Sequence, residues 1–504
     1  MNYSHAVVIA LTFLSNVFVI SATAQTTPEP TAQEKIGYDD LVALVGSGLE
    51  DGTGVTLAQI EAPTANGGYI ANPNDSQLSN SVFVDVTGTN TGSTGHGTRV
   101  GHRLYGSLSI ASGLGQAANP ISAFEAGDFL LNQTNAGSGD PEPFDFDVSN
   151  HSYILYQSQS TLSDAQATNL LQRLDFMVEE NESTMCVGVN NGSANAVPEF
   201  LGFMYNSISV GISSGNHSSG TTTIYGAGRT KPDIVAPENF TSYSTPLVCA
   251  SAAILHEAGA GTDATRTETI RALLLSGATK DEFATWDRTT TRPLDEEFGA
   301  GELNIHNSYL SLQGGEFDGS TGAPSASVGL NGWDYETEIV AGDDLFYQFD
   351  VAQGTRLDQL SIVLCWNMEI IDQSIFGFSP SENLGDLNLD FYDSTGAFLG
   401  TLADESKSTV DNVEHVYLQD LPAGTYHLKV SSDTNRDFGL AWRSTSSDLL
   451  LGDVNSDGIV SFLDISPFVS LLNSGEYQFE ADLDGNGVVN FFDISPFISI
   501  LAAL

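Results

Sequence analysis

The sequence predicts an α/β domain with a largely parallel sheet, then an all-β sandwich, and then a small helical repeat. Apolar strand-like runs alternate with helix-like stretches between residues 37 and 315, a pattern typical of a sheet covered by helices. Short strand candidates separated by turn signals occupy residues 333–446, and a patterned segment occurs twice within residues 447–504. A chain of 504 residues is also too long for one ordinary domain.

The first 36 residues are expected to lie outside the folded domains. Residues 1–24 are predicted to be a signal peptide, because the apolar run Ala6–Ile20 precedes the small-residue cleavage pattern Ala22–Ala24. Residues 25–36 are polar and contain two prolines, so we expect a linker. No later segment has about 18 uninterrupted apolar residues, so we expect a secreted protein with no membrane span after signal removal.

Charge and cysteine content limit the partners and the redox state. The chain has 16 Lys and Arg against 64 Asp and Glu, a formal charge of −48, so nucleic acid is not an expected partner. The carboxylate excess suits a soluble secreted protein that coordinates calcium or works in salty water. Cys186, Cys249 and Cys365 lie in apolar runs and are expected to be buried free thiols, with a Cys186–Cys249 pair as the alternative.

The α/β region, residues 37–315, alternates strands with helices. Its strand candidates are Val55–Ile60, Thr184–Val189 and Ser207–Val210, and its helix candidates are Leu162–Glu179 and Thr245–Ala258. The second helix candidate is apolar over almost its whole length, so we expect it to be buried.

Three short segments of this region carry residues suited to acyl transfer. His96 can accept a proton, Asn190 can donate an amide hydrogen to an oxyanion, and Ser242 precedes the apolar helix. Pro246 suits the first turn of that helix, whose unpaired N–H groups and positive dipole end would face Ser242. Asn191 is the alternative to Asn190 if the register differs by one residue.

With Lys231–Pro237, the segments Gly95–Val100, Val189–Gly192 and Thr241–Pro246 resemble the subtilases. That family has a histidine in His-Gly-Thr, an oxyanion asparagine, and a serine in Gly-Thr-Ser-x-x-x-Pro. The resemblance implies a subtilisin-like catalytic domain and a serine endopeptidase that hydrolyses protein and peptide substrates. It assigns Ser242 as nucleophile, His96 as base and then acid, and Asn190 with the Ser242 N–H as oxyanion donors. The strand Val148–Tyr153 would pair with extended peptide.

The triad carboxylate departs from the family pattern. The family has an aspartate at the end of the first core strand, and here that strand ends in Glu61. Glutamate can accept the imidazole N–H, but its extra methylene moves the carboxylate outward, and a misplacement of about 1 Å can cost about a hundredfold in rate. We expect Glu61 to orient His96, with Asp85 on the following strand as the alternative. Phe240 also replaces the glycine that usually precedes Thr-Ser.

These departures keep a second class of function open. The predicted function is a serine endopeptidase, and the alternative is a catalytically silent subtilase fold that binds peptide or acts as a scaffold. A sedolisin-like acid protease with a Glu/Asp/Ser triad is disfavoured, because His96 occupies the position of the base. The residues 25–36 are too few for a folded inhibitory propeptide, so we expect maturation to end with signal removal.

Residues 333–446 are predicted to form a β-sandwich, joined to the α/β region by a Gly/Ser/Asp-rich linker at 316–332. The segments Leu384–Leu389 and Asp411–Glu414 resemble the jelly-roll domain that follows the catalytic domain in many bacterial subtilases. The strand candidates are Leu345–Phe349, Leu360–Trp366, Leu387–Tyr392, Tyr426–Val430 and Phe438–Trp442.

The C-terminal region, residues 447–504, contains two calcium-type loops. Asp453–Phe468 recurs as Asp482–Phe497, with oxygen side chains at loop positions 1, 3, 5, 9 and 12, Gly at 6 and a backbone carbonyl at 7. The pair of EF-hand-like loops resembles dockerins, which implies calcium as cofactor and a cohesin-like partner, and attachment to a cell surface. The candidate ligands are Asp453, Asn455, Asp457, Ile459, Ser461, Asp464, Asp482, Asp484, Asn486, Val488, Asn490 and Asp493.

Overall fold

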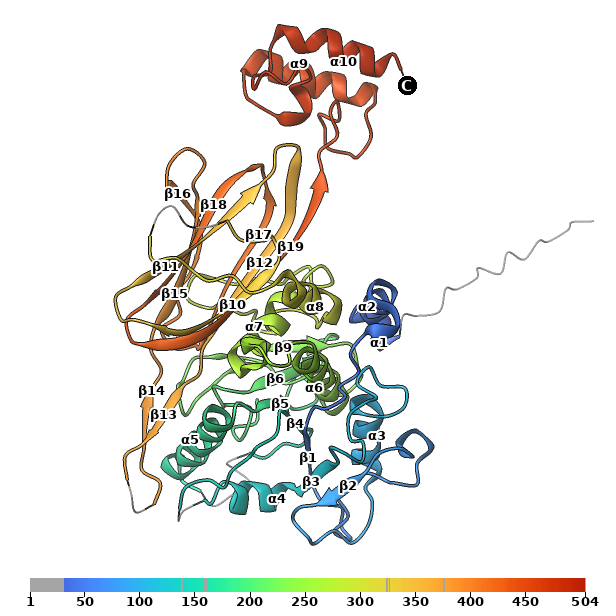
Figure 1. Cartoon of the computed structure of the whole chain (residues 1–504), viewed down its shortest axis with the longest axis vertical. Coiled ribbons are helices and arrows are strands. Elements are labelled where there is room, and N and C mark those ends of the chain that lie inside the picture. The colour runs from blue at the N-terminus through green and yellow to red at the C-terminus, as the bar shows by residue number, and fades with distance from the viewer. Residues whose placement is uncertain are drawn as a thin grey trace, which may run out of the picture.

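The chain is described here by a computed structural model that covers residues 31–136, 139–156, 162–322, 325, 327–374 and 377–503. The predicted signal peptide at 1–24 lies outside the described residues. An α/β region, a β-sandwich and a small helical module follow one another along the long axis of the molecule (Figure 1). This order confirms the predicted fold class. The end of the expected 25–36 linker forms helix α1 (Ala32–Lys35), and Ile36 is completely buried.

The α/β region is built on a seven-stranded parallel sheet of order β2-β3-β1-β4-β5-β6-β9. Its central strands are buried on both faces, so they are apolar almost throughout instead of alternating. The strands are β1 (Leu57–Glu61), β2 (Phe83–Asp85), β3 (Ile121–Glu125), β4 (Val148–His151), β5 (Thr184–Gly188), β6 (Ile208–Ile212) and β9 (Ile234–Ala236).

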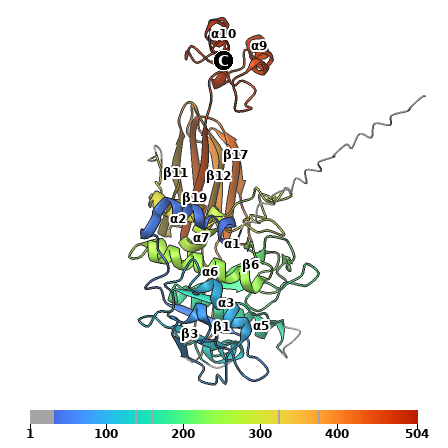
Figure 2. The same ribbon diagram turned by 90° about the vertical axis from the view of Figure 1, so that its right-hand side faces the viewer.

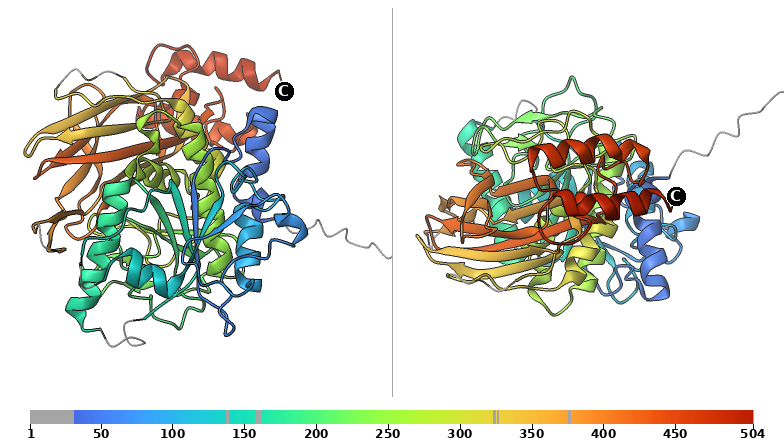
Figure 3. Two further views of the ribbon diagram at one scale, coloured as in Figure 1. Left: turned by 60° about the horizontal axis from the view of Figure 1, so that its bottom comes forward. Right: turned by 90° about the horizontal axis from the view of Figure 1, so that it is seen from above.

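Two hydrophobic cores lie on opposite faces of this sheet. Successive residues of β1 divide between them, because Leu57 packs into one core and Ala58 into the other. The first core is covered by α3 (Gly95–Leu104), α6 (Thr241–Ala258), α7 (Thr267–Gly277) and α8 (Ile305–Gly314), and the second by α5 (Asp164–Asn181). Figure 3 shows these helices around the strands. Helix α6 is buried from Ser244 to His256, as its apolar sequence predicts.

The sandwich consists of two antiparallel four-stranded sheets, β10-β19-β12-β17 and β11-β18-β15-β16. A hairpin of β13 (Glu369–Asp372) and β14 (Pro380–Asn383) extends from it alongside α5 (Figure 1). The sandwich strands are β10 (Gly332–Ile339), β11 (Asp344–Val351), β12 (Thr355–Cys365), β15 (Leu387–Asp393), β16 (Thr401–Ser406), β17 (Val413–Leu421), β18 (Gly424–Ser432) and β19 (Arg436–Asp448).

The expected 316–332 linker lies against the sandwich. The Phe317 N–H donates to the Trp333 carbonyl at 2.9 Å, and the Ser320 N–H donates to the Phe346 carbonyl at 3.0 Å. Part of this segment therefore extends the sandwich through backbone hydrogen bonds, which a composition rich in Gly, Ser and Asp does not indicate.

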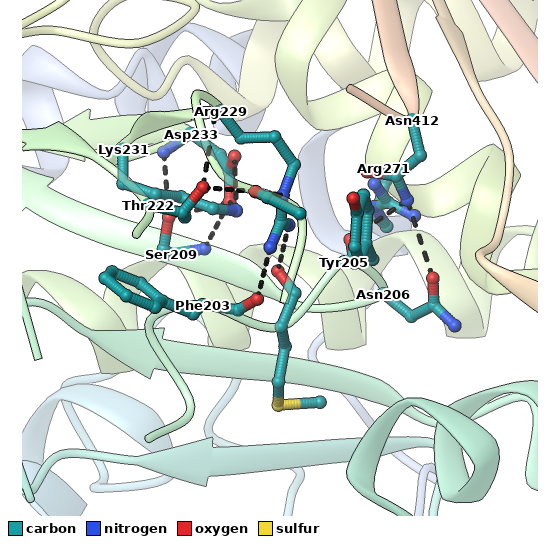
Figure 4. A network of polar contacts seen from close by, with 12 residues as sticks. Phe203, Tyr205, Asn206, Ser209, Thr222, Arg229, Lys231, Asp233, Arg271 and Asn412 are labelled. Atoms are coloured by element: carbon teal, nitrogen blue, oxygen red, sulfur yellow. Dashed lines mark hydrogen bonds and ion pairs between the residues drawn. The ribbon is translucent and has the colours of Figure 1, made fainter. Parts of the chain in front are cut away.

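The sandwich and the α/β region share a core. Trp333 and Ala441 of the sandwich belong to the same hydrophobic cluster as Leu273 of α7. Polar groups also cross this junction, because the Asn412 amide of the sandwich donates to the Tyr205 carbonyl at 3.0 Å (Figure 4). The two parts are therefore packed as one unit.

The helical module contains α9 (Ile465–Ser474) and α10 (Ile494–Leu501), which lie at the far end of the molecule beyond the sandwich (Figure 2). Phe468 and Phe497 occupy equivalent positions of the repeat, and their rings stack with centroids 4.2 Å apart. Both belong to a small hydrophobic core formed by the module alone. Among the helices of the described residues, none has the length and apolar character needed to cross a membrane.

Candidate active site

His96 and Glu61 meet at the carboxyl end of the parallel sheet, the edge where open α/β sheets place their sites. Glu61 is the last residue of β1 and is 1% exposed. His96 lies in the first turn of α3, where the Thr94 hydroxyl caps the helix by accepting the His96 N–H at 3.2 Å. The His96 Nδ1 and Glu61 Oε2 atoms are 2.8 Å apart, so the carboxylate accepts a hydrogen bond from the imidazole.

The second carboxylate oxygen of Glu61 is held by a neutral group. Gln59 Nε2 donates to Glu61 Oε1 at 3.1 Å, and the Tyr105 hydroxyl donates to Gln59 Oε1 at 2.5 Å. A Cβ atom on Gly97 would lie 3.3 Å from the Glu61 Cγ and Cδ atoms. The absence of a side chain at Gly97 therefore leaves room for the Glu61 side chain beside α3.

The hydrogen bond with Glu61 raises the pKa of His96 above its usual value. Partial burial of the ring and the positive charge of Arg99 act in the opposite direction. The carboxylate therefore stabilises the imidazolium form, as a histidine that accepts a proton during a reaction requires.

Asp85 lies away from His96. It is in β2, which β3 separates from β1 in the sheet. Its carboxylate accepts hydrogen bonds from the Tyr69 hydroxyl, from the Gly88 N–H at 2.8 Å and from the Asn90 N–H at 3.2 Å. These bonds organise the turn after β2, and no ion pair or hydrogen bond among the described residues joins Asp85 to His96.

Ser242 is the second residue of α6. Its hydroxyl donates to the Ser152 carbonyl at 3.4 Å, and the Ser152 hydroxyl donates back to the Ser242 carbonyl at 3.2 Å. Ser152 follows β4 directly, so this exchange joins the start of α6 to the carboxyl end of the sheet. In this rotamer the Ser242 hydroxyl is directed to β4, and no hydrogen bond of the described residues joins it to His96.

A cavity of about 90 Å³ lies beside Ser242 and is lined by Ser152, Gly188 and both asparagines. The Asn190 side-chain amide donates to the Tyr156 hydroxyl, and its backbone N–H donates to the Ser218 hydroxyl at 3.0 Å. Asn191 Oδ1 accepts the Thr241 N–H at 2.9 Å. Both candidates for the oxyanion amide therefore border the space next to Ser242.

An aromatic and cationic cluster is centred on Tyr243, which follows Ser242 in the chain; sequence reasoning singled out its Phe240 and missed the other members. The Tyr243 ring is stacked near the His96 ring, with centroids 6.4 Å apart, and its hydroxyl accepts from Arg99 Nε at 2.6 Å. The Arg103 guanidinium lies 4.1 Å above the Tyr243 ring, and Phe240, 52% exposed, contacts the ring edge-on. The spacing of Arg99 and Arg103, three and seven residues after His96, could have indicated a shared helix face.

The C-terminal loops have the oxygen donors of a hard-cation site. One carboxylate oxygen from each of Asp482, Asp484 and Asp493 lies within 4.8 Å of the others. The loop glycines Gly458 and Gly487 have φ of 84° and 83°, the left-handed conformation that the sixth position of a calcium loop demands. These residues fit a bound Ca²⁺ ion in chemistry and backbone geometry.

Together, the parallel sheet, the histidine–carboxylate pair and the serine at the start of a buried helix define the subtilisin-like class of α/β proteins. The Subtilase family model matches residues 39–301, just over half of the chain, and the chain belongs to this family. A dockerin type I domain matches residues 451–501, and domains of this type bind calcium.

Two solved structures resemble the fold at low identity. A protease from Pseudoalteromonas arctica PAMC 21717 has 12% identity and a TM-score of 0.33, over 52% of this chain and 91% of that chain. A serine-to-alanine mutant of the protease domain of PatA has 14% identity and a TM-score of 0.33, over 53% of this chain and 98% of that chain. No curated protein matches the chain.

Proposed function

We propose that the protein is a secreted serine endopeptidase that hydrolyses peptide bonds in protein substrates. The observation that carries this proposal is the 2.8 Å contact between His96 Nδ1 and the buried Glu61 carboxylate. An imidazole held in this way has its other nitrogen available as a base, and the buried carboxylate stabilises the cation that forms.

In the proposed mechanism the Ser242 hydroxyl leaves the Ser152 carbonyl and turns to His96. His96 Nε2 takes the hydroxyl proton as Ser242 Oγ attacks the peptide carbonyl, and His96 then gives this proton to the leaving amine. A water molecule, activated by the same histidine, hydrolyses the resulting acyl-enzyme. Donors near Ser242 stabilise the oxyanion in both steps: the Asn190 side-chain amide and the Ser242 N–H at the start of α6.

The first test is labelling of the purified protein by a fluorophosphonate probe, with Ser242→Ala as the matched variant. Labelling of the wild type alone supports the proposal, because the probe reacts with an activated serine. A folded wild-type protein that resists the probe and cleaves no protein substrate would instead support the silent, peptide-binding scaffold. That alternative is favoured by the Ser242 hydroxyl bonding to Ser152 in this rotamer.

The role of Glu61 is tested by Glu61→Gln, with Asp85→Asn as the control. Loss of the carboxylate from a working triad costs about ten-thousandfold in rate, whereas Asp85→Asn should change the rate little. Because the base must be neutral and Glu61 raises the pKa of His96, the acid limb of the remaining activity should move to lower pH in Glu61→Gln. Glu61→Asp should also lower activity, since it withdraws the carboxylate by one methylene from His96.

The oxyanion role is tested by comparing Asn190→Ala with Asn191→Ala. We expect Asn190→Ala to lower kcat by about a hundredfold to a thousandfold with little change in KM, as loss of an oxyanion donor does. A larger loss of kcat in Asn191→Ala at unchanged melting temperature would assign this role to Asn191.

For the C-terminal module we propose two bound Ca²⁺ ions, one in each loop, and attachment outside the cell to a cohesin-like partner. The convergent carboxylates of the second loop support the metal site. Calorimetry on the whole chain should show two binding events that disappear in Asp453→Ala and Asp482→Ala together. Absence of binding at millimolar calcium would contradict this proposal.

A further inference from the structure

Arg99 is an exposed cation beside the candidate nucleophile and base. It lies one turn after His96 on α3, and its Nε atom donates to the Tyr243 hydroxyl at 2.6 Å. Tyr243 directly follows Ser242 and stacks near His96, so the guanidinium lies at the edge of the reaction site. Its positive charge is among the causes that act on the pKa of His96, which reflects the same proximity.

Arg99 differs from its neighbour Arg103 in charge balance. Arg103 lies one turn further along α3 and forms an ion pair with Glu238 at 2.6 Å. Among the described residues, no carboxylate forms an ion pair with Arg99. In a chain with 64 acidic and 16 basic residues, a cation without an acidic partner at this position is available to a ligand.

The proposed reaction determines which part of a bound substrate lies next to Arg99. The cavity beside Ser242 is lined by Ser152, Gly188 and Asn190 and not by His96 or Tyr243, whose rings lie near each other. Because the histidine gives its proton to the leaving amine, the peptide segment after the cleaved bond must lie on the His96 side. Arg99 is therefore placed to meet side chains just after that bond.

We propose that Arg99 binds an acidic side chain on the leaving-group side of the cleaved bond, so that the enzyme selects protein substrates with aspartate or glutamate there. The planar guanidinium keeps donors besides the Nε–H that Tyr243 accepts, and these match a carboxylate. The exposed ring of Phe240, which packs edge-on against Tyr243, would flank the same segment. This inference rests on the proposed peptidase function for its kinetic consequence.

The test uses three fluorogenic peptides that differ only by Glu, Gln or Lys at the first two positions after the cleaved bond. Since the overall charge of −48 repels acidic peptides from the whole protein, the informative quantity is the wild-type to Arg99→Gln ratio of kcat/KM for each peptide. We expect this ratio to be about three- to fivefold higher for the Glu peptide than for the Gln peptide at low salt. Any uniform effect of the substitution cancels in this comparison.

Two further variants sharpen the test. Relative to wild type, Arg99→Glu should shift the preference from the Glu peptide towards the Lys peptide. Arg292→Gln, which removes a cation paired with Asp287 and Glu296, should leave the peptide preference as in wild type. Added salt should reduce the effect of Arg99 because it screens an exposed pair. Equal ratios for the Glu and Gln peptides would overturn the inference.

A binding measurement separates this inference from the proposed function. In Ser242→Ala protein, the added Arg99→Gln change should weaken binding of the labelled Glu peptide more than binding of the Gln peptide, as measured by fluorescence anisotropy. If no peptide is cleaved and no probe labels Ser242, the peptidase proposal fails, and the anisotropy result alone decides whether Arg99 selects acidic peptides. An equal loss of affinity for the two peptides would then reject the inference.

Discussion

The sandwich has two junctions, and they differ in kind. Its junction with the α/β region is a continuous hydrophobic core in which the β19 and α7 backbones nearly touch, so that a Cβ atom on Gly439 would lie 2.4 Å from the Thr269 nitrogen. Its junction with the helical module is a short contact, where the Leu449 N–H donates to the Gly354 carbonyl at 2.8 Å and Phe479 lies over Gly354. The module keeps a separate core around Phe468 and Phe497.

This difference teaches which parts of the chain fold together. A shared core couples the folding of its two sides, because each side buries apolar surface that the other would leave exposed to water. A short contact between two separate cores allows each to unfold alone. The sandwich is thus structurally part of the peptidase-like unit, and the dockerin module is an appended domain.

Removal of the sandwich should have the largest effect. A fragment of residues 31–315 would expose the apolar surface of α7 that packs against Trp333 and Ala441. We expect this fragment to be insoluble or unfolded and to show no probe labelling at Ser242, as measured by circular dichroism and fluorophosphonate labelling. A fragment of residues 31–448 is the control, and a folded, reactive 31–315 fragment would break the comparison.

Buried acids make the large junction sensitive to pH. Burial raises the pKa of Glu179 on α5 to about 8, with the Asp437 charge adding to the effect and the Arg436 charge opposing it. In the unfolded chain this carboxyl titrates near 4.5, so stability from this group is greatest below that pH and is lost as pH rises to about 8. Glu268 on α7 has a raised pKa from burial as well.

Glu179→Gln should therefore flatten the pH dependence of stability. At about 1.4 kcal/mol per pH unit, the wild type should lose up to about 4 kcal/mol of unfolding free energy from this group between pH 5 and pH 8. The variant should be more stable than the wild type at pH 8 and similar to it at pH 5, in urea unfolding monitored by tryptophan fluorescence. Equal slopes for both proteins would show that Glu179 is not coupled to this junction.

The closeness of β19 to α7 is tested by Gly439→Ala. The added Cβ meets backbone atoms of Thr269 and Glu268, which cannot move aside as a side chain could. We expect a loss of about 1–3 kcal/mol in a single unfolding transition shared by the α/β region and the sandwich. Gly322→Ala, where a Cβ meets nothing within 4 Å, should leave stability within about 0.5 kcal/mol. Two separate transitions in Gly439→Ala would contradict a shared core.

The sequence predicted the layers of this molecule and missed the contacts between them. Periodicity and motif order are local signals, so they indicated the parallel sheet, the sandwich, the buried α6 and the calcium loops. The approach of Gly439 to Thr269 joins segments far apart in the chain, and no pattern along the sequence reports it. The same limit applies to the 316–332 segment, whose polar composition indicated a linker although its backbone pairs with sandwich strands.

The candidate site divides in the same way. The resemblance to the subtilases predicted Glu61 near His96, because that family has its triad carboxylate at the end of the first core strand, and the two side chains are in contact in the structure. The Gln59 and Gly97 contacts that fit the glutamate depend on side-chain packing around α3, and so does the stacking of Tyr243 near His96. Such contacts are decided by tertiary structure, which residue types alone do not specify.

The smallest effect is expected from removing the module. Strand β19 runs to Asp448, which pairs with Thr355, so it continues two residues past the predicted boundary at 446. The truncated chain should therefore end after Asp448. A chain ending there keeps every strand of the sandwich and the whole shared core. We expect its kcat/KM on soluble peptides to stay within about twofold of the full chain, and its main melting transition within about 2 °C.

Calcium removal from the full chain should have the same selective effect. If the loops bind Ca²⁺, a chelator removes metal ions only from the module. It should therefore abolish a separate melting transition of the module and leave the transition of the α/β region and sandwich in place. The control is the chain ending at Asp448, in which chelator should change neither melting nor peptide hydrolysis. A fall in activity in the full chain but not in this truncation would mean that the disordered module interferes with the peptidase unit. A fall in activity in both proteins would place a calcium site within the peptidase unit. Metal dependence would then not be confined to the module.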